Sequence, residues 1–317
     1  MGKITGFKEF KRQNPQKLAI QVRIGDYQEF YEDWDEKEVS IQGSRCMDCS
    51  VPFCMGGCPL GNIIPDFNDL VYRGLWKEAL EKLHSTNNFP DFTGRICPAP
   101  CEASCVLNIN DNPVSIENIE RSISDRGWKE NWIIPNPPEK RTGKRVAVIG
   151  SGPAGLAAAQ QLNRAGHIVT VYEKSDRIGG LLRLGIPDFK LGKDIVQKRV
   201  DQMEQEGITF LVNSYVGKNI SIESIIAKTD SVLLTGGSTI PRNLDIEGRE
   251  LDGVHYAMEF LTQQNILNSG DSLNDITPIN AKGKNVIILG GGDTGSDCLG
   301  TSLRQGAKSI YQLELLP

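Results

Sequence analysis

The pattern of apolar and polar positions changes near residue 140. Before that point apolar residues recur every three or four positions in short stretches, and the stretch from Leu70 to Leu83 predicts a helix. After it, short runs are apolar at almost every position, which is typical of strands buried on both faces of a parallel sheet. Four such runs are predicted as strands, at residues 145–150, 168–173, 231–237 and 285–290.

The part before residue 140 has its own organisation. Residues 1–45 are charged and weakly periodic, which predicts an arm that packs on the rest of the protein. Residues 46–132 combine short helical patterns with clustered cysteines, which indicates a small helical domain built around metal sites. The proline-rich run at residues 135–140 is extended and stiff, and we interpret it as a linker.

The first predicted strand leads into a turn with the pattern G-x-G-x-x-G. The first glycine of this pattern allows a tight turn, the second lets the backbone approach a pyrophosphate, and the third allows close packing of helix on strand. An acid at the end of the following strand can bind ribose hydroxyls. The candidate dinucleotide-binding residues are Gly150, Ser151, Gly152, Pro153, Ala154, Gly155 and Glu173.

The same strand–turn–helix pattern starts again after the strand at 285–290. This repetition predicts an α/β fold with two Rossmann-like dinucleotide-binding units. The alternative is a structural copy that binds nothing. The candidate residues of the second unit are Gly290, Gly291, Gly292, Asp293, Thr294, Gly295 and Glu314.

Two sites suggest two different dinucleotides, a tightly bound FAD at the first and an exchanging NAD(P)H at the second. A glycine-rich loop follows the first site and could lie against a flat ring, although it could also be an ordinary surface loop. Glu314 would bond a 2′-hydroxyl and repel a 2′-phosphate, which favours NADH over NADPH. Further candidates for the flavin are Gly180, Leu181, Gly185, Ile186, Thr235, Gly236 and Gly237.

The cysteines are unusual in their clustering, because seven of the eight lie between Cys46 and Cys105. Zinc sites are typically built from paired CxxC or CxxC/His motifs, and these thiols have one CxxC and no neighbouring histidine. The spacing therefore favours iron–sulfur clusters over zinc or structural thiols. Two 4Fe–4S clusters need about eight ligands, so a carboxylate after Cys105 is expected to complete the set. Cys298 is expected in a core.

Composition excludes several functions. A net charge of −5 argues against binding to nucleic acid or to an anionic membrane, and no apolar run is long enough to span a bilayer. HExxH and GxSxG motifs are absent, which argues against zinc or serine hydrolysis. The N-terminal residues do not read as a secretory signal, so we expect a reducing compartment, the cytoplasm. In such a compartment clustered cysteines indicate metal ligands before disulfides.

These motifs together resemble the small subunit of glutamate synthase and the related N-terminal half of dihydropyrimidine dehydrogenase. The resemblance covers essentially the whole chain, and its further matching segments are Arg45–Cys54, Gly94–Pro98, Ser115–Arg121, Val148–Leu156, Gly185–Leu191 and Gly290–Asp297. It implies a helical domain with two 4Fe–4S clusters at residues 1–140, the first segment of an FAD domain at 141–280, and the incomplete start of an NAD(P)H domain at 281–317.

The resemblance also implies a mechanism. Hydride passes from NAD(P)H to FAD, and electrons pass through the clusters to FMN in a large subunit, which makes glutamate from 2-oxoglutarate and glutamine. One cluster would be held by Cys46, Cys49, Cys54 and Cys105, and the other by Cys58, Cys97, Cys101 and Glu120.

Two features depart from the family. Three residues separate Cys97 from Cys101, where several relatives have five, and we expect a shorter loop rather than a lost ligand. The chain also ends where the nicotinamide domain is half built, so we expect a fragment with little NAD(P)H-dependent activity of its own.

Two other functions remain open. The chain could be the input subunit of a related ferredoxin:NADP oxidoreductase or dihydropyrimidine dehydrogenase, and only the partner distinguishes these. It could also be a non-catalytic, cluster-bearing fragment.

Overall fold

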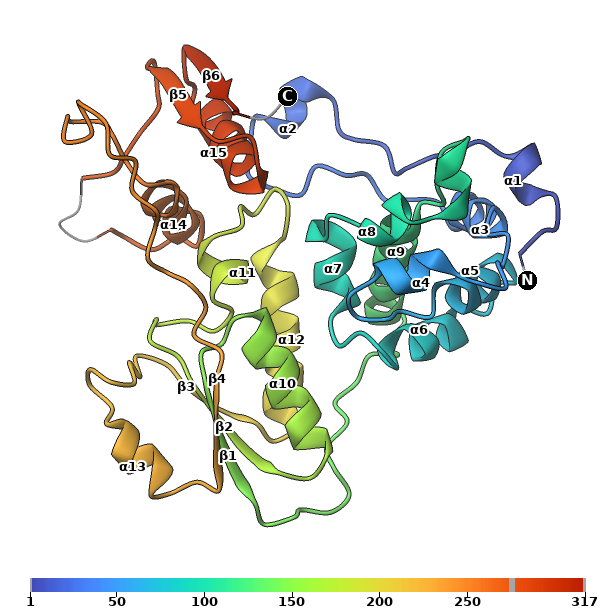
Figure 1. The fold of residues 1–317 in the computed structure, drawn as a ribbon, viewed down its shortest axis with the longest axis horizontal. Helices are drawn as coiled ribbons and strands as arrows, with labels where there is room; N and C mark the ends of the chain where they lie inside the picture. Colours follow the sequence, from blue (N-terminus) through green and yellow to red (C-terminus); the bar gives the residue numbers. More distant parts are fainter. Residues whose placement is uncertain (1, 274–276, 316–317) are drawn as a thin grey trace. The chain divides into compact units, whose positions relative to one another are not determined.

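A computed structural model describes residues 2–273 and 277–315 (Figure 1). Leu316 and Pro317, where the third expected domain ends, lie outside the described residues. The chain forms two compact units. Unit 1 comprises Met1–Leu18 and Phe30–Pro135, and unit 2 comprises Ala19–Glu29 and Asn136–Pro317.

Unit 1 is built from short helices. They are α1 (Gly6–Glu9), α3 (Glu36–Ser44), α4 (Phe53–Gly57), α5 (Ile64–Tyr72), α6 (Trp76–His84), α7 (Pro90–Ile96), α8 (Pro100–Ala103), the 3-10 helix η1 (Val106–Ile109) and α9 (Ile116–Lys129). The apolar faces of α5, α6 and α9 meet in one core that includes Phe67, Val71, Leu80, Leu83, Ile119 and Ile123. Most cysteines of the cluster region pack against this core, so the core holds the loops that carry them.

The single helix predicted from Leu70 to Leu83 is wrong. Helix α5 ends at Tyr72 and α6 begins at Trp76. Gly74 between them has a φ of +74°, the left-handed conformation that commonly ends a helix. The apolar spacing continues across the break because both helices bury their apolar residues in the same core.

Unit 2 contains a four-stranded parallel sheet in the order β3-β2-β1-β4. The strands are β1 (Arg145–Ile149), β2 (Ile168–Tyr172), β3 (Thr209–Leu211) and β4 (Ser231–Leu234), so the runs predicted from 145, 168 and 231 are confirmed as strands. Helices α10 (Pro153–Arg164) and α12 (Lys193–Gln205) cover one face, and α13 (Ile222–Ile226) lies on the other (Figure 1). A short helix, α11 (Leu181–Leu184), follows β2.

A second parallel pair, β5 (Asn285–Leu289) and β6 (Ser309–Leu313), is connected through α15 (Asp293–Arg304). Helix α14 (Ala257–Asn268) packs on α15, and the buried residues between these elements are Phe260, Leu261, Ile288 and Cys298. Cys298 is therefore a core residue, as expected.

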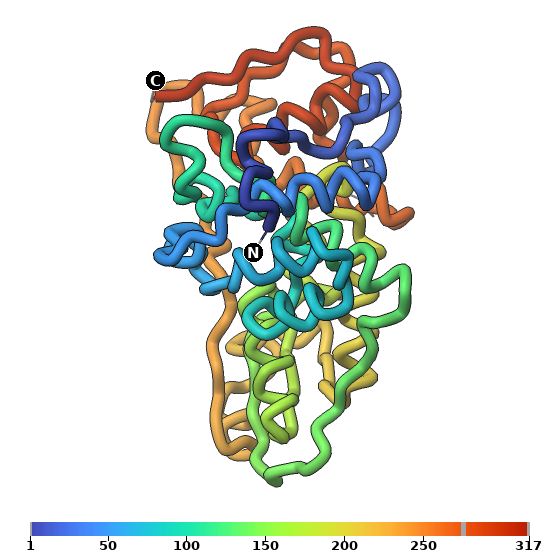
Figure 2. Tube along the Cα trace, turned by 90° about the vertical axis from the view of Figure 1, so that its right-hand side faces the viewer, coloured from blue at the N-terminus to red at the C-terminus, as the bar shows by residue number. Residues whose placement is uncertain are grey.

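Residues 19–29 lie between two parts of unit 1 in the sequence but belong to unit 2 in the structure. Backbone hydrogen bonds from Leu18 N to Phe30 O and from Glu32 N to Gln16 O close the base of this segment. Its helix α2 (Ile20–Arg23) lies beside α15 in both views (Figures 1 and 2). Arg304 of α15 donates to the carbonyl oxygens of Arg23 at 2.6 Å and Asp26 at 2.7 Å.

Across the described ranges, no helix combines the length and the apolar character needed to cross a membrane.

Candidate cofactor sites

Four cysteines line one pocket of unit 1. Cys46 follows α3, Cys54 lies in α4, and Cys105 directly precedes η1, while Cys49 lies in the loop between the first two. The remaining lining residues are Met47, Pro52, Phe53, Ile64, Pro65, Asn68, Val106, Leu107, Val114 and Ile116. The fold thus gathers, around an apolar space, the four thiols that the family resemblance assigns to one cluster.

A backbone N–H group at this pocket donates a hydrogen bond to a cysteine sulfur. Burial raises the pKa of Cys46 to about 11, and a hydrogen bond from the Asp48 backbone partly offsets it. Burial likewise raises the pKa of Cys54 to about 12. Asp48 has a φ of +50°, a strained conformation for a residue other than glycine. Buried thiols that need a positive charge to ionise, with N–H groups directed at them, fit an iron–sulfur cluster.

The other three clustered cysteines form a second group. Cys58, Cys97 and Cys101 lie within electrostatic range of one another, and Cys97 and Cys101 lie within range of Glu120. Burial and then the neighbouring carboxylate of Glu120 raise the pKa of Cys101 well above its ordinary value. Helices α7 and α9 pack closely at Gly94 because glycine has no side chain. A Cβ at that position would lie 2.6 Å from the backbone nitrogen of Arg121.

The loop from Cys97 to Cys101 holds three residues. Ala99, between two prolines, has a φ of +51°. Its N–H donates to the Cys97 sulfur at 3.4 Å. The left-handed residue two positions after a cysteine therefore occurs at both groups, after Cys46 and after Cys97.

Glu120 is buried, with 6% of its surface exposed. Its Oε1 accepts from Asn62 Nδ2 at 2.7 Å, and its Oε2 accepts from Thr93 Oγ1 at 3.2 Å. Burial raises the pKa of Glu120 to about 7. Each carboxylate oxygen keeps a second lone pair, so this held side chain can still bind a metal.

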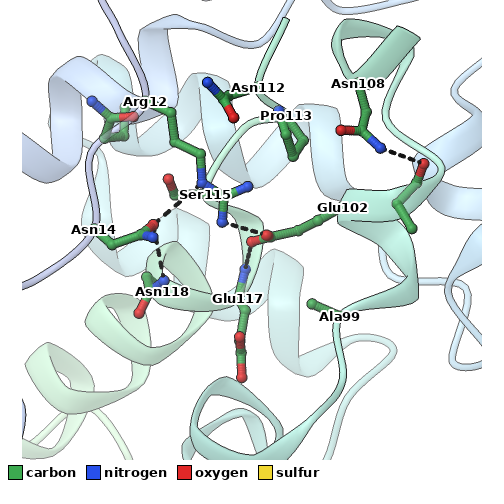
Figure 3. A network of polar contacts seen from close by, with 12 residues as sticks. Arg12, Asn14, Ala99, Glu102, Asn108, Asn112, Pro113, Ser115, Glu117 and Asn118 are labelled. Carbon is green, nitrogen blue, oxygen red and sulfur yellow. Dashed lines mark hydrogen bonds and ion pairs between the residues drawn. The ribbon is translucent and has the colours of Figure 1, made fainter. Parts of the chain in front are cut away.

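Two further acids lie near the second group. Glu102 pairs with Arg12, and its Oε1 accepts from the Glu117 backbone N–H at 3.1 Å (Figure 3). Burial and then Glu102 raise the pKa of Glu117 to about 8. The second group is therefore richer in carboxyl groups than the first.

No three metal-binding side chains in the described ranges could together hold a single metal ion.

The first glycine turn has the geometry of a dinucleotide site. Gly150 has a φ of +108°, and a Cβ on Gly155 would lie 2.0 Å from the Gly150 carbonyl oxygen. A Cβ on Gly152 would meet no atom within 4 Å, so that position opens on free space at the start of α10. The space fits a bound pyrophosphate at a helix N-terminus.

Glu173 is buried at the end of β2 and accepts from the backbone N–H of Ser151 at 3.0 Å and of Ser175 at 2.8 Å. The Ser151 hydroxyl also bonds Glu173 and accepts from Gly179 N at 3.0 Å. A Cβ on Gly180 would lie 3.0 Å from the Gly152 Cα, so the glycine-rich loop packs against the turn. Ser151 thus connects the first glycine turn with Glu173 and with the glycine-rich loop.

The remaining flavin candidates lie in two places, at the first glycine turn and around α11. The Thr235 hydroxyl donates to the Gly150 carbonyl oxygen at 3.1 Å, and a Cβ on Gly150 would lie 3.1 Å from the Gly236 Cα, which places Thr235 and Gly236 at the turn. Gly237 follows them in the chain with a φ of +68°. Gly185 and Ile186 lie past the end of α11, where the Ile186 oxygen accepts from Asn265 of α14 at 3.2 Å. Leu181, the first residue of α11, is exposed.

The second turn repeats the first. Gly290 has a φ of +121°, a Cβ on Gly292 would meet nothing within 4 Å, and a Cβ on Gly295 would lie 2.2 Å from the Gly290 oxygen. Glu314 follows β6 and accepts from the Gly291 backbone N–H. Asp293 and Thr294 begin α15, as Pro153 and Ala154 begin α10.

Sequence reasoning missed the partners of these sites. Asn62 and Thr93 reach Glu120 across 58 and 27 residues of sequence, and no local pattern marks them. Asn68, which lines the first cysteine pocket, was not singled out either.

Comparison with known proteins identifies both parts of the chain. Residues 23–132 match the family described as dihydropyrimidine dehydrogenase domain II, 4Fe-4S cluster. Residues 144–317, more than half of the chain, match the family described as pyridine nucleotide-disulphide oxidoreductase.

Relatives that match almost the whole chain include several glutamate synthases. The glutamate synthase [NADPH] small chains of Mycobacterium tuberculosis (strain ATCC 25618 / H37Rv) and Bacillus subtilis (strain 168) are 56% and 53% identical over 96% and 98% of this chain. The chain spans 63% and 65% of their lengths, which is less than two thirds. Glutamate synthase [NADH] of Saccharomyces cerevisiae (strain ATCC 204508 / S288c) is 52% identical over 99% of this chain and 15% of its own. The chain therefore belongs to the pyridine nucleotide-disulphide oxidoreductase family, with a 4Fe-4S cluster domain preceding that part, and is homologous to the small chains of glutamate synthase.

Proposed function

We propose that the chain is the electron-input part of a glutamate synthase. The observation that carries this proposal is the gathering of seven cysteines and Glu120 into two groups, in the same chain as two glycine turns that open on free space. When bound, FAD accepts hydride from NAD(P)H and the clusters carry single electrons. A large subunit with FMN would use two electrons and two protons to convert 2-oxoglutarate and glutamine into two glutamates.

The ligand assignment belongs to this proposal. Cys46, Cys49, Cys54 and Cys105 would hold one 4Fe–4S cluster, and Cys58, Cys97, Cys101 and Glu120 the other. The separate pocket of the first four supports this division, as does the electrostatic proximity of Cys97 and Cys101 to both Cys58 and Glu120.

The nucleotide sites are assigned in chain order. Residues 150–155 with Glu173 would bind FAD, and the loop beginning at Gly179 would lie along it. Residues 290–295 with Glu314 would bind the nicotinamide dinucleotide. In domain terms, residues 1–140 would carry the clusters, 141–280 the flavin, and 281–317 the start of the nicotinamide domain, in a cytoplasmic protein.

Glu314 bears on the choice of nicotinamide. Its carboxylate lies at the second glycine turn, where it would accept from a ribose 2′-hydroxyl and repel a 2′-phosphate. We therefore propose NADH as the preferred donor, although relatives carry both names. A much higher kcat/KM for NADPH in the full-length protein would contradict this preference.

The function is tested by reconstitution. The full-length protein, purified without oxygen, is expected to carry FAD and about eight iron atoms. Mixed with a glutamate synthase large chain, it should form glutamate from 2-oxoglutarate and glutamine at the expense of NADH or NADPH. Electron transfer only to ferredoxin, or reduction of a pyrimidine, would instead indicate one of the related enzymes. Protein with clusters but no NAD(P)H oxidation with any acceptor would indicate a non-catalytic role.

A further inference from the structure

Asn68 is a buried amide in an apolar place. It lies on α5, is 0% exposed, and lines the pocket of Cys46, Cys49, Cys54 and Cys105. Neither its Nδ2 nor its Oδ1 has a hydrogen-bond partner in the described structure. Every other described residue that lines this pocket is apolar or carries sulfur.

An unpartnered buried amide is costly, because it has lost water and gained nothing in return. The lining offers its N–H no oxygen acceptor from a side chain, so the side-chain acceptors within the pocket are sulfur atoms. Among these sulfur atoms, that of Cys46 lies beside the Asn68 side chain, with no hydrogen bond between the two in the described structure.

We propose that Asn68 is a positioning residue for the 4Fe–4S cluster of this pocket, donating an N–H···S hydrogen bond that raises the cluster's reduction potential. The inference rests on the proposed function, which places that cluster on these four cysteines. A donor to sulfur stabilises the reduced state more, because the reduced cluster carries one more negative charge. Accepting one electron is therefore easier with the amide in place.

The test is an EPR-monitored redox titration of the full-length, cluster-loaded protein and its variants. Asn68→Leu keeps the volume and removes the donor, so the one-electron reduction equilibrium of this cluster should shift toward oxidation by about tenfold, which is about 59 mV. Asn68→Ser keeps a hydroxyl donor and should stay closer to wild type. The second cluster in the same molecule should not shift.

Ser124→Ala is the matched control. Ser124 is also fully buried in unit 1 without a partner for its hydroxyl, but it does not line the pocket. It should leave both potentials unchanged.

The outcomes separate this inference from the proposed function. Wild-type protein without two clusters would contradict the function itself. Two clusters with an unchanged potential in Asn68→Leu would overturn only the role of Asn68. A higher reduction potential in Asn68→Leu would also overturn it, because that result indicates water entering the pocket. Loss of the cluster in both Asn68 variants would overturn it too, because that result indicates a purely structural role.

Discussion

At the scale of single residues, the proposed cofactor sites depend on the surroundings of Glu120 and on the absence of a side chain at Gly152. Glu120 has both oxygens held by neutral donors, which orients it without supplying a counter-charge. Gly152 has open space where any other residue would carry a Cβ. The family resemblance singled out Glu120 and the glycine motif singled out Gly152, and the structure adds the surroundings that make each assignment testable.

Glu120→Ala is expected to lose one cluster and spare the other, because the second group then has only three ligands. Iron content should fall from about eight to about four atoms per chain, with loss of one EPR signal. Glu120→Cys should retain the cluster, since thiolate is its usual ligand. Glu117→Ala, three residues earlier on α9, is the control and should keep the iron. Full iron with unchanged EPR signals in Glu120→Ala would mean that another group ligates the cluster.

Gly152→Val is expected to fold and to lose FAD. The protein leaves room for the new side chain, whereas a pyrophosphate at the start of α10 would collide with it. Flavin absorbance after gel filtration measures the loss, and thermal unfolding checks the fold. Gly292→Val, the equivalent change in the second turn, should retain FAD and weaken nicotinamide binding at least about tenfold. The opposite pattern would exchange the two site assignments.

At the scale of elements, buried polar groups join helices that the apolar pattern leaves separate. Glu206 at the end of α12 is 0% exposed and accepts from Arg164 of α10 at 2.8 Å. It also accepts from the backbone of Asn136 in the linker at 3.2 Å. One carboxylate thus connects α10, α12 and the linker residue Asn136.

Lys193 at the start of α12 has a similar role and a pH signature. Its Nζ donates to the carbonyl oxygens of Ile186 at 2.5 Å and Leu191 at 3.2 Å. Burial lowers the pKa of Lys193 to about 8. Below pH 8 the lysine is charged in both states and its burial costs stability. Between about pH 8 and 10.5 the unfolded chain holds more protons, so stability rises with pH.

Lys193→Met should remove this rise. The free energy of unfolding of wild type minus that of the variant should increase from pH 7 to pH 10, by at most about 3 kcal/mol. Urea unfolding at several pH values measures it, and titrating cysteines cancel in the difference. Lys198→Met, at an exposed position of the same helix, should show a pH-independent difference. A flat profile for Lys193→Met would show that its pKa is not lowered.

At the scale of the whole molecule, the chain passes between the two units at three points, after residues 18, 29 and 135. The segment between the first two crossings is held in unit 2 by Arg304, whose guanidinium also stacks 3.8 Å from the centre of the Phe189 ring. A single linker would leave the units joined once, whereas this segment joins them twice more.

Arg304→Ala should release residues 19–29. Hydrogen bonds from a charged group contribute about 1.5–3 kcal/mol, so opening of the segment should become at least about tenfold more frequent. Trypsin cleavage after Arg23, followed by mass spectrometry under native conditions, measures the opening. Arg249→Ala, which affects a different loop of unit 2, is the control. An unchanged cleavage rate would mean that Arg304 does not hold the segment.

The amino-acid sequence by itself determined the features that depend on neighbours in the chain. The strands at 145–149, 168–172 and 285–289 follow from continuous apolar runs, and the glycine turns from their spacing. Apolar spacing alone did not separate α5 from α6, because both helices bury the same side of one core.

Only the tertiary structure decided which distant residues meet. It separated the four thiols around one pocket from those beside Glu120, and it placed Asn68 among the first group. It also carried residues 19–29 into unit 2. These outcomes depend on how helices pack, since a close approach such as that of Gly94 to Arg121 is set by the whole core and leaves no periodic mark in the sequence.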